Sequence, residues 1–564
     1  MESLDWIVIA VFCLVLIGII VWVMKQKQNN SDDYFLGGRD ATWIAIGASI
    51  FASNIGSEHL IGLAGAGASS GMAMAHWEIQ GWMILILGWV FVPFYSRSMV
   101  YTMPEFLERR YNAQSRTILS IISLVSYVLT KVAVTVYAGG LVFQQVFGIK
   151  ELWGIDFFWI AAIGLVLLTA VYTIFGGMKS VLYTSVLQTP ILLLGSLIIV
   201  VLGLRALGGW DEMMRICGAV TVNNYGDSMT DLMRSNNDPN FPWIGALMGS
   251  AIIGFWYWCT DQYIVQRVLS GKNQKEARRG SIFGAYLKLL PVFLFLIPGM
   301  IAFALNQKAL AAGGSSFLPM LANGKVYADA AFPTLVAKLL PAGVKGLVVC
   351  GILAALMSSL ASLFNSSAML FTIDFYKRFK PNTSEKKLVH IGQIATVVIV
   401  ILGILWIPIM RSIGSVLYTY LQDVQSVLAP GIAAAFLLGI TWKRTSAQGG
   451  MWGLISGLVI GMTRLGSKIY YSNVADATQT LFKYVFYDVN WLFFCGWMLL
   501  FCIIVVVVVS LCTKAPSKEK IQGLVFGTAT AEQKAVTRAS WNHWDVINSI
   551  IILGITAAFY IYFW

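Results

Sequence analysis

The stretch Ala52-Ser53-Asn54-Ile55-Gly56-Ser57-Glu58-His59 lies in the middle of an apolar segment that is long enough to cross a membrane. It places an amide, a carboxylate and an imidazole at bilayer depth, where a polar group is costly unless it has a partner. Gly and Ser also interrupt the apolar run, and a broken helix is tolerated only where its backbone is buried in protein or lines a wet cavity. The stretch therefore predicts a functional site inside a membrane-spanning bundle.

The composition is that of an integral membrane protein. Of the 564 residues, 58% are hydrophobic and only 12% are charged, which leaves too little polar surface for a soluble multidomain enzyme. Apolar runs of about 20 residues predict about 14 membrane-spanning helices, and the connections are too short and polar for a separate soluble domain. The expected spans are 5–24, 41–70, 76–96, 117–146, 155–175, 181–207, 241–269, 280–306, 345–375, 389–410, 413–440, 447–470, 491–512 and 545–563.

The positive charges indicate how these spans are oriented. The formal net charge is +12, and with the N-terminus outside, Lys and Arg concentrate in the loops that face the cytoplasm. The basic runs 272–279 and 377–387 fall on that side, which favours topology and lipid contact over nucleic-acid binding. An even number of spans places both termini on the external or periplasmic side of the plasma (inner) membrane. Only Cys217 falls in a predicted external loop, so we expect no extracellular disulfide framework.

A second interruption recurs five spans after the first. Gly254 and the stretch 256–262, Trp-Tyr-Trp-Cys-Thr-Asp-Gln, again put polar groups in mid-span. Interrupted spans at matching places in two halves are typical of inverted-repeat transporters. The alternative for Asp261 is a buried ion pair with Arg267. We expect one extra helix in 1–30, inverted repeats in 41–207 and 241–440, and three further helices in 447–564.

Several other spans carry polar side chains that a packed bundle does not need. Glu78 and Lys288 supply opposite charges, which could neutralise one another or face a common polar ligand. Taken singly, each group is explained by an interhelical hydrogen bond, but the whole set favours a binding site. The set comprises Glu78, Gln80, Lys131, Lys288, Gln422, Asp423 and Gln425.

Aromatic residues accompany this polar set. A sugar ring offers an apolar C–H face to an aromatic ring, and its hydroxyls suit side chains that donate or accept hydrogen bonds. The combination therefore favours an uncharged, polyhydroxylated ligand. Interfacial anchoring is the simpler explanation for a Trp or Tyr at a span end, but it is weaker for Tyr257 and Trp258, which lie inside a span. The aromatic residues are Trp77, Tyr257, Trp258 and Tyr418.

The segment 354–362, Ala-Ala-Leu-Met-Ser-Ser-Leu-Ala-Ser, combines small residues with hydroxyl groups. Small residues at this spacing permit close helix packing, which explains the segment without any ligand. A hard monovalent cation such as Na⁺, however, takes oxygen ligands, and carbonyls of a broken helix together with the hydroxyls of Ser358 and Ser359 would supply them. Such a neutral site selects a cation by geometry rather than by gross charge.

Motifs at several places along the chain carry a family resemblance. They are Asp33-Tyr34-Phe35-Leu36-Gly37-Gly38-Arg39, Gly47-Ala48-Ser49 leading into 52–59, Pro104-Glu105-Phe106-Leu107 with Arg109-Arg110-Tyr111, 256–267, and Ser358-Ser359-Leu360 with Asn365-Ser366. From about residue 30 to about 470 the chain resembles the solute:sodium symporter family, in particular its sodium/glucose (galactose) cotransporter branch of bacterial type. The resemblance implies an all-α membrane fold of the LeuT-like kind, with a five-plus-five inverted repeat, broken helices and alternating access.

The resemblance also implies roles for individual residues. A sugar site would be made by Asn54, His59, Glu78, Trp258, Lys288 and Gln422. Gates would be Tyr257 on the inside and Leu63, Trp77 and Tyr418 on the outside. Sodium would bind the backbone carbonyls of Ala52, Ile55 and Ala355 and the hydroxyls of Ser358 and Ser359. Sodium is then a co-transported ligand, and no other cofactor is expected.

Some positions depart from the family pattern. Ser185 stands where many relatives have an Asp associated with sodium, and Ala361 stands where two-sodium members tend to have a hydroxyl, so we expect one sodium per sugar. Gly254 and Gln425 leave the identity of the sugar open, while His59 favours glucose or galactose over myo-inositol. We therefore expect a sodium-coupled monosaccharide importer. The alternatives are a symporter for myo-inositol or another polar solute, a channel, a non-transporting sensor and a membrane enzyme; a primary pump is disfavoured because no nucleotide-binding loop is present.

Overall fold

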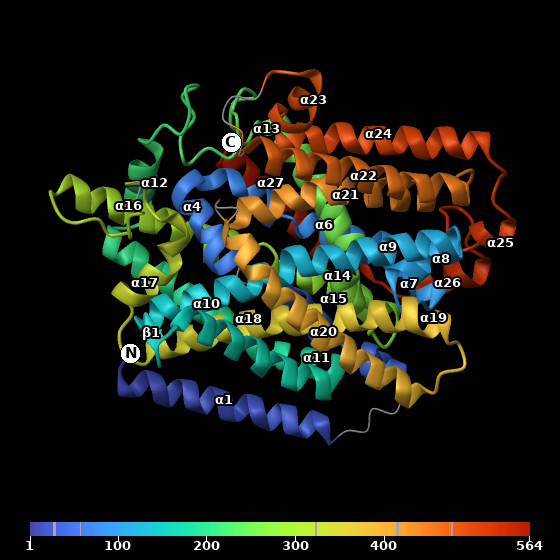
Figure 1. Ribbon diagram of the computed structural model, residues 1–564, viewed down its shortest axis with the longest axis horizontal. Helices are drawn as coiled ribbons and strands as arrows, with labels where there is room; N and C mark the ends of the chain where they lie inside the picture. The colour runs from blue at the N-terminus through green and yellow to red at the C-terminus, as the bar shows by residue number, and fades with distance from the viewer. Residues whose placement is uncertain (26–29, 57, 322–323, 413–416, 473, 475–477) are drawn as a thin grey trace.

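The computed structural model describes residues 1–25, 30–56, 58–321, 324–412, 417–472, 474 and 478–564. Ser57 of the first interruption and residues 413–416 of the expected span 413–440 lie outside the described residues. The described chain is almost entirely helical, and long helices lie side by side along the longest axis of the molecule (Figure 1). Two short strands pair antiparallel in a small hairpin. The predicted all-α class is confirmed.

The first part of the chain runs from α1 to the short helix α12. Its elements are α1 (Ser3–Met24), α2 (Ser31–Leu36), η1 (Gly37–Arg39), α3 (Trp43–Asn54), η2 (Glu58–Leu63), α4 (Ala64–Ser70), η3 (Gly71–Met74), α5 (Ala75–Glu78), α6 (Gly81–Ile86), η4 (Leu87–Phe91), α7 (Val92–Ser98), α8 (Met103–Arg110), α9 (Ala113–Ser126), η5 (Tyr127–Val132), α10 (Ala133–Phe147), β1 (Glu151–Leu152), β2 (Ile155–Asp156), α11 (Phe157–Leu207) and α12 (Trp210–Gly218).

The second part of the chain repeats the mixture of long helices and short irregular turns. Its elements are α13 (Trp243–Gly254), η6 (Phe255–Thr260), α14 (Gln262–Leu269), α15 (Gln274–Leu287), η7 (Val292–Leu296), α16 (Ile297–Ala311), η8 (Ala328–Ala330), α17 (Ala331–Leu339), α18 (Val344–Met369), η9 (Leu370–Tyr376), α19 (Lys377–Phe379), α20 (Glu385–Ser412), α21 (Leu417–Thr441), α22 (Ala447–Ser472), α23 (Leu481–Lys483), η10 (Tyr484–Asp488), α24 (Trp491–Cys512), α25 (Lys518–Ile521), α26 (Ala531–Ala539) and α27 (His543–Tyr562).

Ten helical segments among the described residues are long and apolar enough to cross a membrane. Two shorter apolar helices, Trp43–Asn54 and Phe157–Val171, accompany them. Breaks divide several expected spans into shorter helices, so the number of about 14 spans stays a prediction. The chain is nevertheless built of many membrane-spanning segments, as its composition requires.

Gly177 separates two of the expected spans inside the long helix α11. Its backbone has φ 53° and ψ −150°, a conformation that residues with a Cβ rarely adopt. A Cβ at this position would also lie 2.5 Å from the carbonyl oxygen of Tyr34. Glycine therefore permits both the bend in α11 and the close approach of α2.

Both interruptions predicted from the sequence are present. α3 ends at Asn54, Ile55 is extended with φ −79° and ψ 101°, and the π-helix η2 begins at Glu58. In the second interruption η6 ends at Thr260, and Asp261 is extended with φ −77° and ψ 127° before α14 begins. Each break exposes backbone groups that a continuous helix would have paired internally. The predicted broken helices are thus confirmed.

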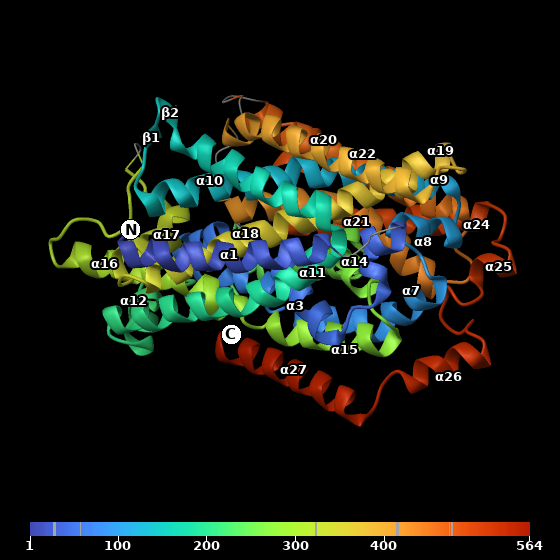
Figure 2. The ribbon, with the colours of Figure 1, turned by 90° about the horizontal axis from the view of Figure 1, so that it is seen from below.

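The first broken helix lies against three long helices. α3 packs on α15, α11 and α18, and α11 and α18 run along one another. α1 lies outside this pair, where it contacts both (Figure 2). The interruption at Ile55, whose side chain is fully buried, is therefore enclosed by protein rather than by lipid.

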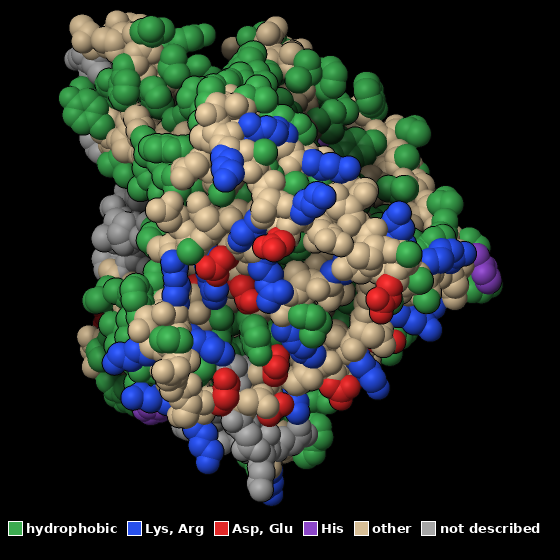
Figure 3. Space-filling model, turned by 90° about the vertical axis from the view of Figure 1, so that its right-hand side faces the viewer, with side chains coloured by type: hydrophobic (Ala, Val, Ile, Leu, Met, Phe, Trp, Pro, Cys, Tyr) green, Lys and Arg blue, Asp and Glu red, His purple; other side chains and the backbone are tan. Residues whose placement is uncertain are grey.

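One end of the molecule is rich in charge. Figure 3 shows the end that carries α8, α19, α25 and α26, where Lys and Arg side chains gather with Asp and Glu among them. The basic runs 272–279 and 377–387 lie in the α14–α15 and α19–α20 connections and in the helix ends beside them. Both chain termini lie away from the charged end, toward the opposite end of the molecule (Figures 1 and 2).

Candidate functional site

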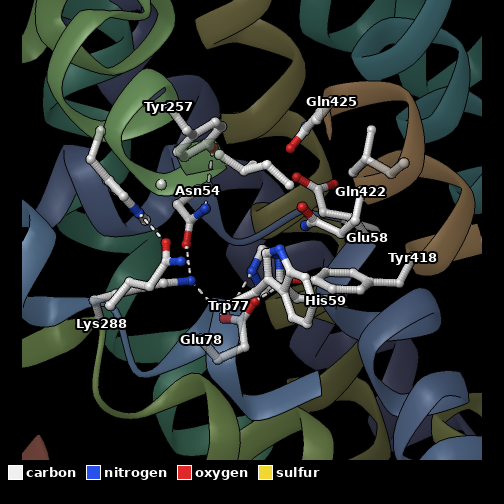
Figure 4. A pocket seen from close by; sticks show the side chains of 15 residues that line it. Asn54, Glu58, His59, Trp77, Glu78, Tyr257, Lys288, Tyr418, Gln422 and Gln425 are labelled. Atoms are coloured by element: carbon white, nitrogen blue, oxygen red, sulfur yellow. Dashed lines mark hydrogen bonds and ion pairs between the residues drawn. The ribbon is translucent and has the colours of Figure 1, made fainter. Parts of the chain in front are cut away.

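A buried cavity lies between the two interruptions, and Figure 4 shows the side chains around it. Its volume is about 40 Å³, and because one water needs about 10–15 Å³ on this scale, it has room for only a few waters. The walls come from α3, η2, α5, α13, η6, the end of α15 and α21. The lining residues are Asn54, Glu58, His59, Trp77, Glu78, Gln80, Ile253, Gly254, Tyr257, Trp258, Lys288, Tyr418, Leu421, Gln422 and Gln425.

A buried ion pair crosses this cavity. Lys288 Nζ donates to Glu78 Oε2 at 2.6 Å and to Asn54 Oδ1 at 3.0 Å. Asn54 Nδ2 in turn donates to the hydroxyl of Tyr257 at 3.1 Å, so that residues of four elements form one network (Figure 4). The predicted neutralisation of Glu78 by Lys288 is confirmed. The cavity therefore presents hydrogen-bonding groups whose opposite charges compensate one another.

Two further side chains approach the same carboxylate. The hydroxyl of Tyr418 donates to Glu78 Oε1, and His59 Nε2 lies 3.2 Å from Glu78 Oε2. That distance is short enough for an ion pair, and the other ring nitrogen, Nδ1, has no hydrogen-bond partner among the described residues. The His59 ring instead packs edge-on against Tyr418, with centroids 6.0 Å apart. Hydrogen-bonding capacity of the imidazole is thus left for a ligand.

Gln80 holds one wall of the cavity; the sequence placed it in the polar set but not in the sugar site. Its Oε1 accepts a hydrogen bond of 3.0 Å from Trp258 Nε1, and its Nε2 donates to the carbonyl of Ser250 at 2.8 Å. A Cβ added to Gly254 would lie 2.7 Å from Gln80 Oε1. The glycine that departs from the family pattern therefore makes room for this amide. Glu58 and Gln425 also line the cavity although the sequence did not assign them to the sugar site.

Three of the four expected gate residues line the cavity. They are Trp77, Tyr257 and Tyr418, whereas Leu63 is fully buried in η2 and is not among the lining residues. The ring of Trp77 stacks on Trp491 of α24 with centroids 5.5 Å apart and an interplanar angle of 16°. A helix outside the expected repeats thus supports this wall of the cavity.

Two lining groups have unused hydrogen-bonding atoms. Gln422 Oε1 and Trp77 Nε1 are buried without a hydrogen-bond partner among the described residues. The amide oxygen of Gln422 can accept a hydrogen bond and the indole N–H of Trp77 can donate one. One ligand with both a donor and an acceptor could therefore bind both residues. A hydroxyl group offers both.

The residues expected to bind sodium are brought together where α3 ends against α18. The hydroxyls of Ser53 and Ser362 are 2.6 Å apart, and those of Tyr263 and Ser359 are 3.1 Å apart. The hydroxyl of Ser358 lies 3.3 Å from that of Ser185 on α11. All the expected sodium ligands are buried; they are Ala52, Ile55, Ala355, Ser358 and Ser359.

The chemistry of these groups fits a hard monovalent cation. Carbonyl and hydroxyl oxygens are neutral, hard ligands, and the described part of the chain has no cluster of three or more His, Cys, Asp or Glu side chains suited to a metal ion. Ser359 also borders the broken end of α3, because a Cβ on Gly56 would lie 2.8 Å from its hydroxyl oxygen. A cation bound here would touch the same interruption that carries Asn54.

Asp261 does not pair with Arg267, the partner that the sequence offered as an alternative. It accepts a bond of 2.5 Å from Lys131 Nζ of η5 and a second bond from the hydroxyl of Tyr127. The Arg267 Nε donates instead to the hydroxyl of Ser53 at 3.2 Å. The correction has a geometric cause: Asp261 is the extended N-cap of α14, and its carboxylate accepts from the backbone N–H of Tyr263 at 3.3 Å while it faces Lys131 and Tyr127 of η5.

The fold matches that of a solved transporter. Over 92% of this chain and 99% of the other, it superposes with a TM-score of 0.73 and 22% identity on the substrate-bound outward-open state of a Na⁺-coupled sialic acid symporter. With its broken helices facing a polar cavity, the chain therefore has the LeuT-like fold of secondary transporters.

The sequence comparisons add the family. Residues 34–457 match the family model described as the sodium:solute symporter family, and the chain belongs to that family. It is a sodium-coupled solute symporter of the membrane, with many spans, and not an enzyme.

Two curated relatives with different named solutes are equally similar in sequence to this chain. The human sodium/myo-inositol cotransporter 2 is 37% identical over 546 residues, which cover 94% of this chain and 79% of that protein. The sodium/glucose cotransporter 4 of Danio rerio is 37% identical over 534 residues, which cover 92% of this chain and 80% of that protein. The names of these two relatives therefore divide between a cyclic polyol and a sugar.

Proposed function

We propose that this symporter imports a neutral monosaccharide of the glucose or galactose type together with one sodium ion, by alternating access. The observation that carries the proposal is the network of Glu78, Lys288, Asn54 and Tyr257 between the two broken helices. The charges of this network compensate one another, so a charged solute would find no free counter-charge in it, whereas a neutral polyol needs none. myo-Inositol is the second candidate, favoured by the relatives that carry its name.

The hydroxyl groups of the substrate would form hydrogen bonds with side chains that line the cavity. Asn54, His59, Glu78, Trp258, Lys288 and Gln422 would bind it, with His59 and Gln422 offering groups that have no other hydrogen-bond partner among the described residues. A cavity of about 40 Å³ is too small for a hexose. Binding therefore requires the side chains of the gates to move, namely Trp77, Tyr418 and Leu63 on the outside and Tyr257 on the inside.

Sodium would bind between the broken end of α3 and the serine face of α18. Its ligands would be the carbonyls of Ala52, Ile55 and Ala355 and the hydroxyls of Ser358 and Ser359. Because Ile55 directly follows Asn54, a cation at this break would fix the helix end that presents Asn54 and His59 to the solute. Binding of sodium first, and of solute second, follows from this shared element.

Neutral groups at Ser185 and Ala361 support a ratio of one sodium to one solute. The hydroxyl of Ser185 is already engaged, because it donates to the carbonyl of Val181 at 2.6 Å and lies beside Ser358. No carboxylate is thus present on this face of α11 to hold a second cation. One positive charge per cycle would contribute about 2.3 kcal/mol for each 100 mV of inside-negative potential.

The proposed arrangement in the membrane follows the positive-inside rule. The charged end shown in Figure 3 would face the cytoplasm, with both termini outside, in the plasma (inner) membrane. The inverted repeats would comprise 41–207 and 241–440, preceded by the helix in 1–30 and followed by three helices in 447–564. Both chain ends lying away from the charged end supports this orientation.

Uptake by proteoliposomes containing the purified protein tests the function. We expect sodium, but not potassium, to drive uptake of glucose or galactose, and preloaded unlabelled sugar to accelerate entry of labelled sugar. Exchange of this kind requires a carrier, whereas a channel permits only downhill flux. A panel of hexoses, myo-inositol, sialic acid and proline identifies the solute. Preference for proline or sialic acid would contradict the neutral-polyol assignment, and unchanged sodium stimulation in Ser359→Ala would contradict the cation site.

A further inference from the structure

Gln188 of α11 carries a buried amide that no described residue satisfies. The side chain is 1% exposed, and neither its Nε2 nor its Oε1 has a hydrogen-bond partner among the described residues. A buried amide without partners is costly, and native structures explain such groups by an ordered water or an ion. Its helical neighbours are satisfied, since Ser185 donates to Val181 and Thr189 donates to the carbonyl of Ala48 at 3.2 Å. Within the described part of the chain, both amide atoms are thus free to bind a water or an ion.

The packing of α11 on α18 shows what Gln188 faces. Ser185 lies 3.3 Å from Ser358, and Leu192 lies 3.3 Å from the position a Cβ on Gly351 would take. The two helices thus run antiparallel, with 185 opposite 358 and 192 opposite 351. Residues three and four apart share one face of a helix.

The same spacing places Gln188 opposite Ala355. On α11, Gln188 lies between Ser185 and Leu192 on their common face, and on α18, Ala355 lies between Gly351 and Ser358 on theirs. The contact of Thr189 with Ala48 shows that this turn of α11 also touches α3, one helical turn before Ala52. The amide is thus enclosed by the two helices from which the proposed sodium ligands come.

We propose that Gln188 Oε1 is a further oxygen ligand of the transported sodium ion, bound directly or through one water. The assignment rests on the sodium site proposed above and adds a residue that determines cation affinity and selectivity. An amide oxygen is a hard, neutral ligand. It would complete the coordination from the α11 side, where Ser185 offers no charge and its hydroxyl is already engaged. The number of coordinating dipoles is one of the factors that set selectivity among monovalent cations.

Replacing the amide by an apolar side chain of similar size tests the assignment. In Gln188→Leu we expect the sodium concentration for half-maximal uptake to rise about tenfold, equivalent to about 1.4 kcal/mol. Uptake at saturating sodium should be retained, and the preference for sodium over lithium should change. Gln188→Glu should lower the sodium requirement, because its carboxylate attracts the cation more strongly. Ser196→Ala, buried two turns further along α11, is the matched control and should behave as wild type.

A binding readout without transport separates this role from a structural one. Sodium should raise the thermal denaturation temperature of the purified protein in the absence of solute, and the sodium midpoint of that shift should rise in Gln188→Leu. A purely structural role would lower the denaturation temperature without moving the midpoint. If Gln188→Leu does not accumulate, Gln188→Asn, which keeps the amide but withdraws it by one methylene, should show the same direction of change.

The outcomes distinguish this assignment from the proposed function. If wild-type uptake does not depend on sodium, the proposed function fails and this ligand with it. If Ser359→Ala moves the sodium midpoint while Gln188→Leu leaves both midpoint and selectivity unchanged, only the assignment of Gln188 is overturned.

Discussion

Lys288 Nζ lies 2.6 Å from Glu78 Oε2 inside a cavity that two broken helices enclose. Both side chains are at most 3% exposed, so neither charge is compensated by water. The pair joins the end of α15 to α5, which are far apart in sequence. The Glu78 carboxylate also accepts a hydrogen bond from the Tyr418 hydroxyl and lies close to the His59 ring. This contact neutralises two of the ionisable side chains that line the cavity, whose lining also includes Glu58 and His59.

Replacing one member of this ion pair should lower the stability of the protein more than replacing both members. Glu78→Gln or Lys288→Met alone leaves a buried charge without its partner, and we expect a loss of about 3–5 kcal/mol of stability together with loss of uptake. The double variant should recover much of the stability but not the uptake. Thermal denaturation of the purified variants measures the loss of stability. Glu212→Gln, which breaks an exposed pair with Arg215, is the control. Single variants as stable as wild type would falsify the buried-pair argument.

Removing the hydroxyl of Tyr257 should weaken the inner side of the site. Tyr257→Phe loses the bond from Asn54 Nδ2, and about 0.5–1.5 kcal/mol of net hydrogen-bond energy corresponds to a change of about two- to tenfold. We expect the solute concentration for half-maximal uptake to rise by that factor while the fold stays intact. Tyr286→Phe, which removes a hydroxyl that contacts Asn548, should leave uptake unchanged. Equal effects of the two variants would argue against a gate at Tyr257.

A carboxylate at position 185 should change the coupling ratio. Ser185→Asp would place a buried negative charge beside the hydroxyl of Ser358, now 3.3 Å away, and such a charge needs a cation partner. We expect the Hill coefficient for sodium to move from about 1 toward about 2 and pH to influence uptake. The flux ratio of labelled sodium to labelled solute measures this change. Ser185→Ala should keep the wild-type ratio, and an unchanged ratio in Ser185→Asp would contradict the prediction.

Adding a methyl group at position 254 should disturb solute binding through Gln80. In Gly254→Ala the new Cβ would lie 2.7 Å from Gln80 Oε1, so the amide must move and its bond from Trp258 Nε1 is lost. We expect the half-maximal solute concentration to rise about two- to tenfold, with an altered ratio of hexose to myo-inositol uptake. Gly164→Ala, at a position where no atom lies within 4 Å of the added Cβ, is the control. A solute profile identical to wild type would count against a role for Gln80.

Arg110 should be essential to the stability of the charged end. Its guanidinium donates to the carbonyls of Gly439, Thr445 and Trp442 at 2.7, 3.1 and 3.2 Å, where α21 ends. Lys cannot reproduce this planar fork, so Arg110→Lys should lose about 1–3 kcal/mol. Thermal denaturation checks the loss. Arg109→Lys, whose side chain is 44% exposed, should change stability little, and equal denaturation temperatures for the two variants would contradict the prediction.

Much of the site could be predicted because its chemistry is visible residue by residue. Asn54, Glu78 and Lys288 are recognisable from the sequence because polar groups at mid-span need partners. Gln80 was recognised as part of the polar set but given no role, and Gln188 was not singled out, since an amide in a membrane span is equally well explained by a hydrogen bond between helices. The partner that the alternative explanation gave to Asp261 was wrong for a related reason: Arg267 is near in sequence, but Lys131 is near in space. Spacing along the sequence identifies possible partners that are nearby in the chain, but it does not show which distant residue is the partner.

The sequence alone determined that this protein is a bundle of membrane helices interrupted near Ile55 and Asp261, because apolar length and mid-span polarity are local properties of the chain. Only the tertiary structure decided which polar groups meet. Glu78 is reached by Lys288, His59 and Tyr418 from three other elements, and Gln188 is set opposite Ala355 by the packing of α11 on α18. Such contacts depend on how helices pack over long sequence separations, and no local pattern encodes that register.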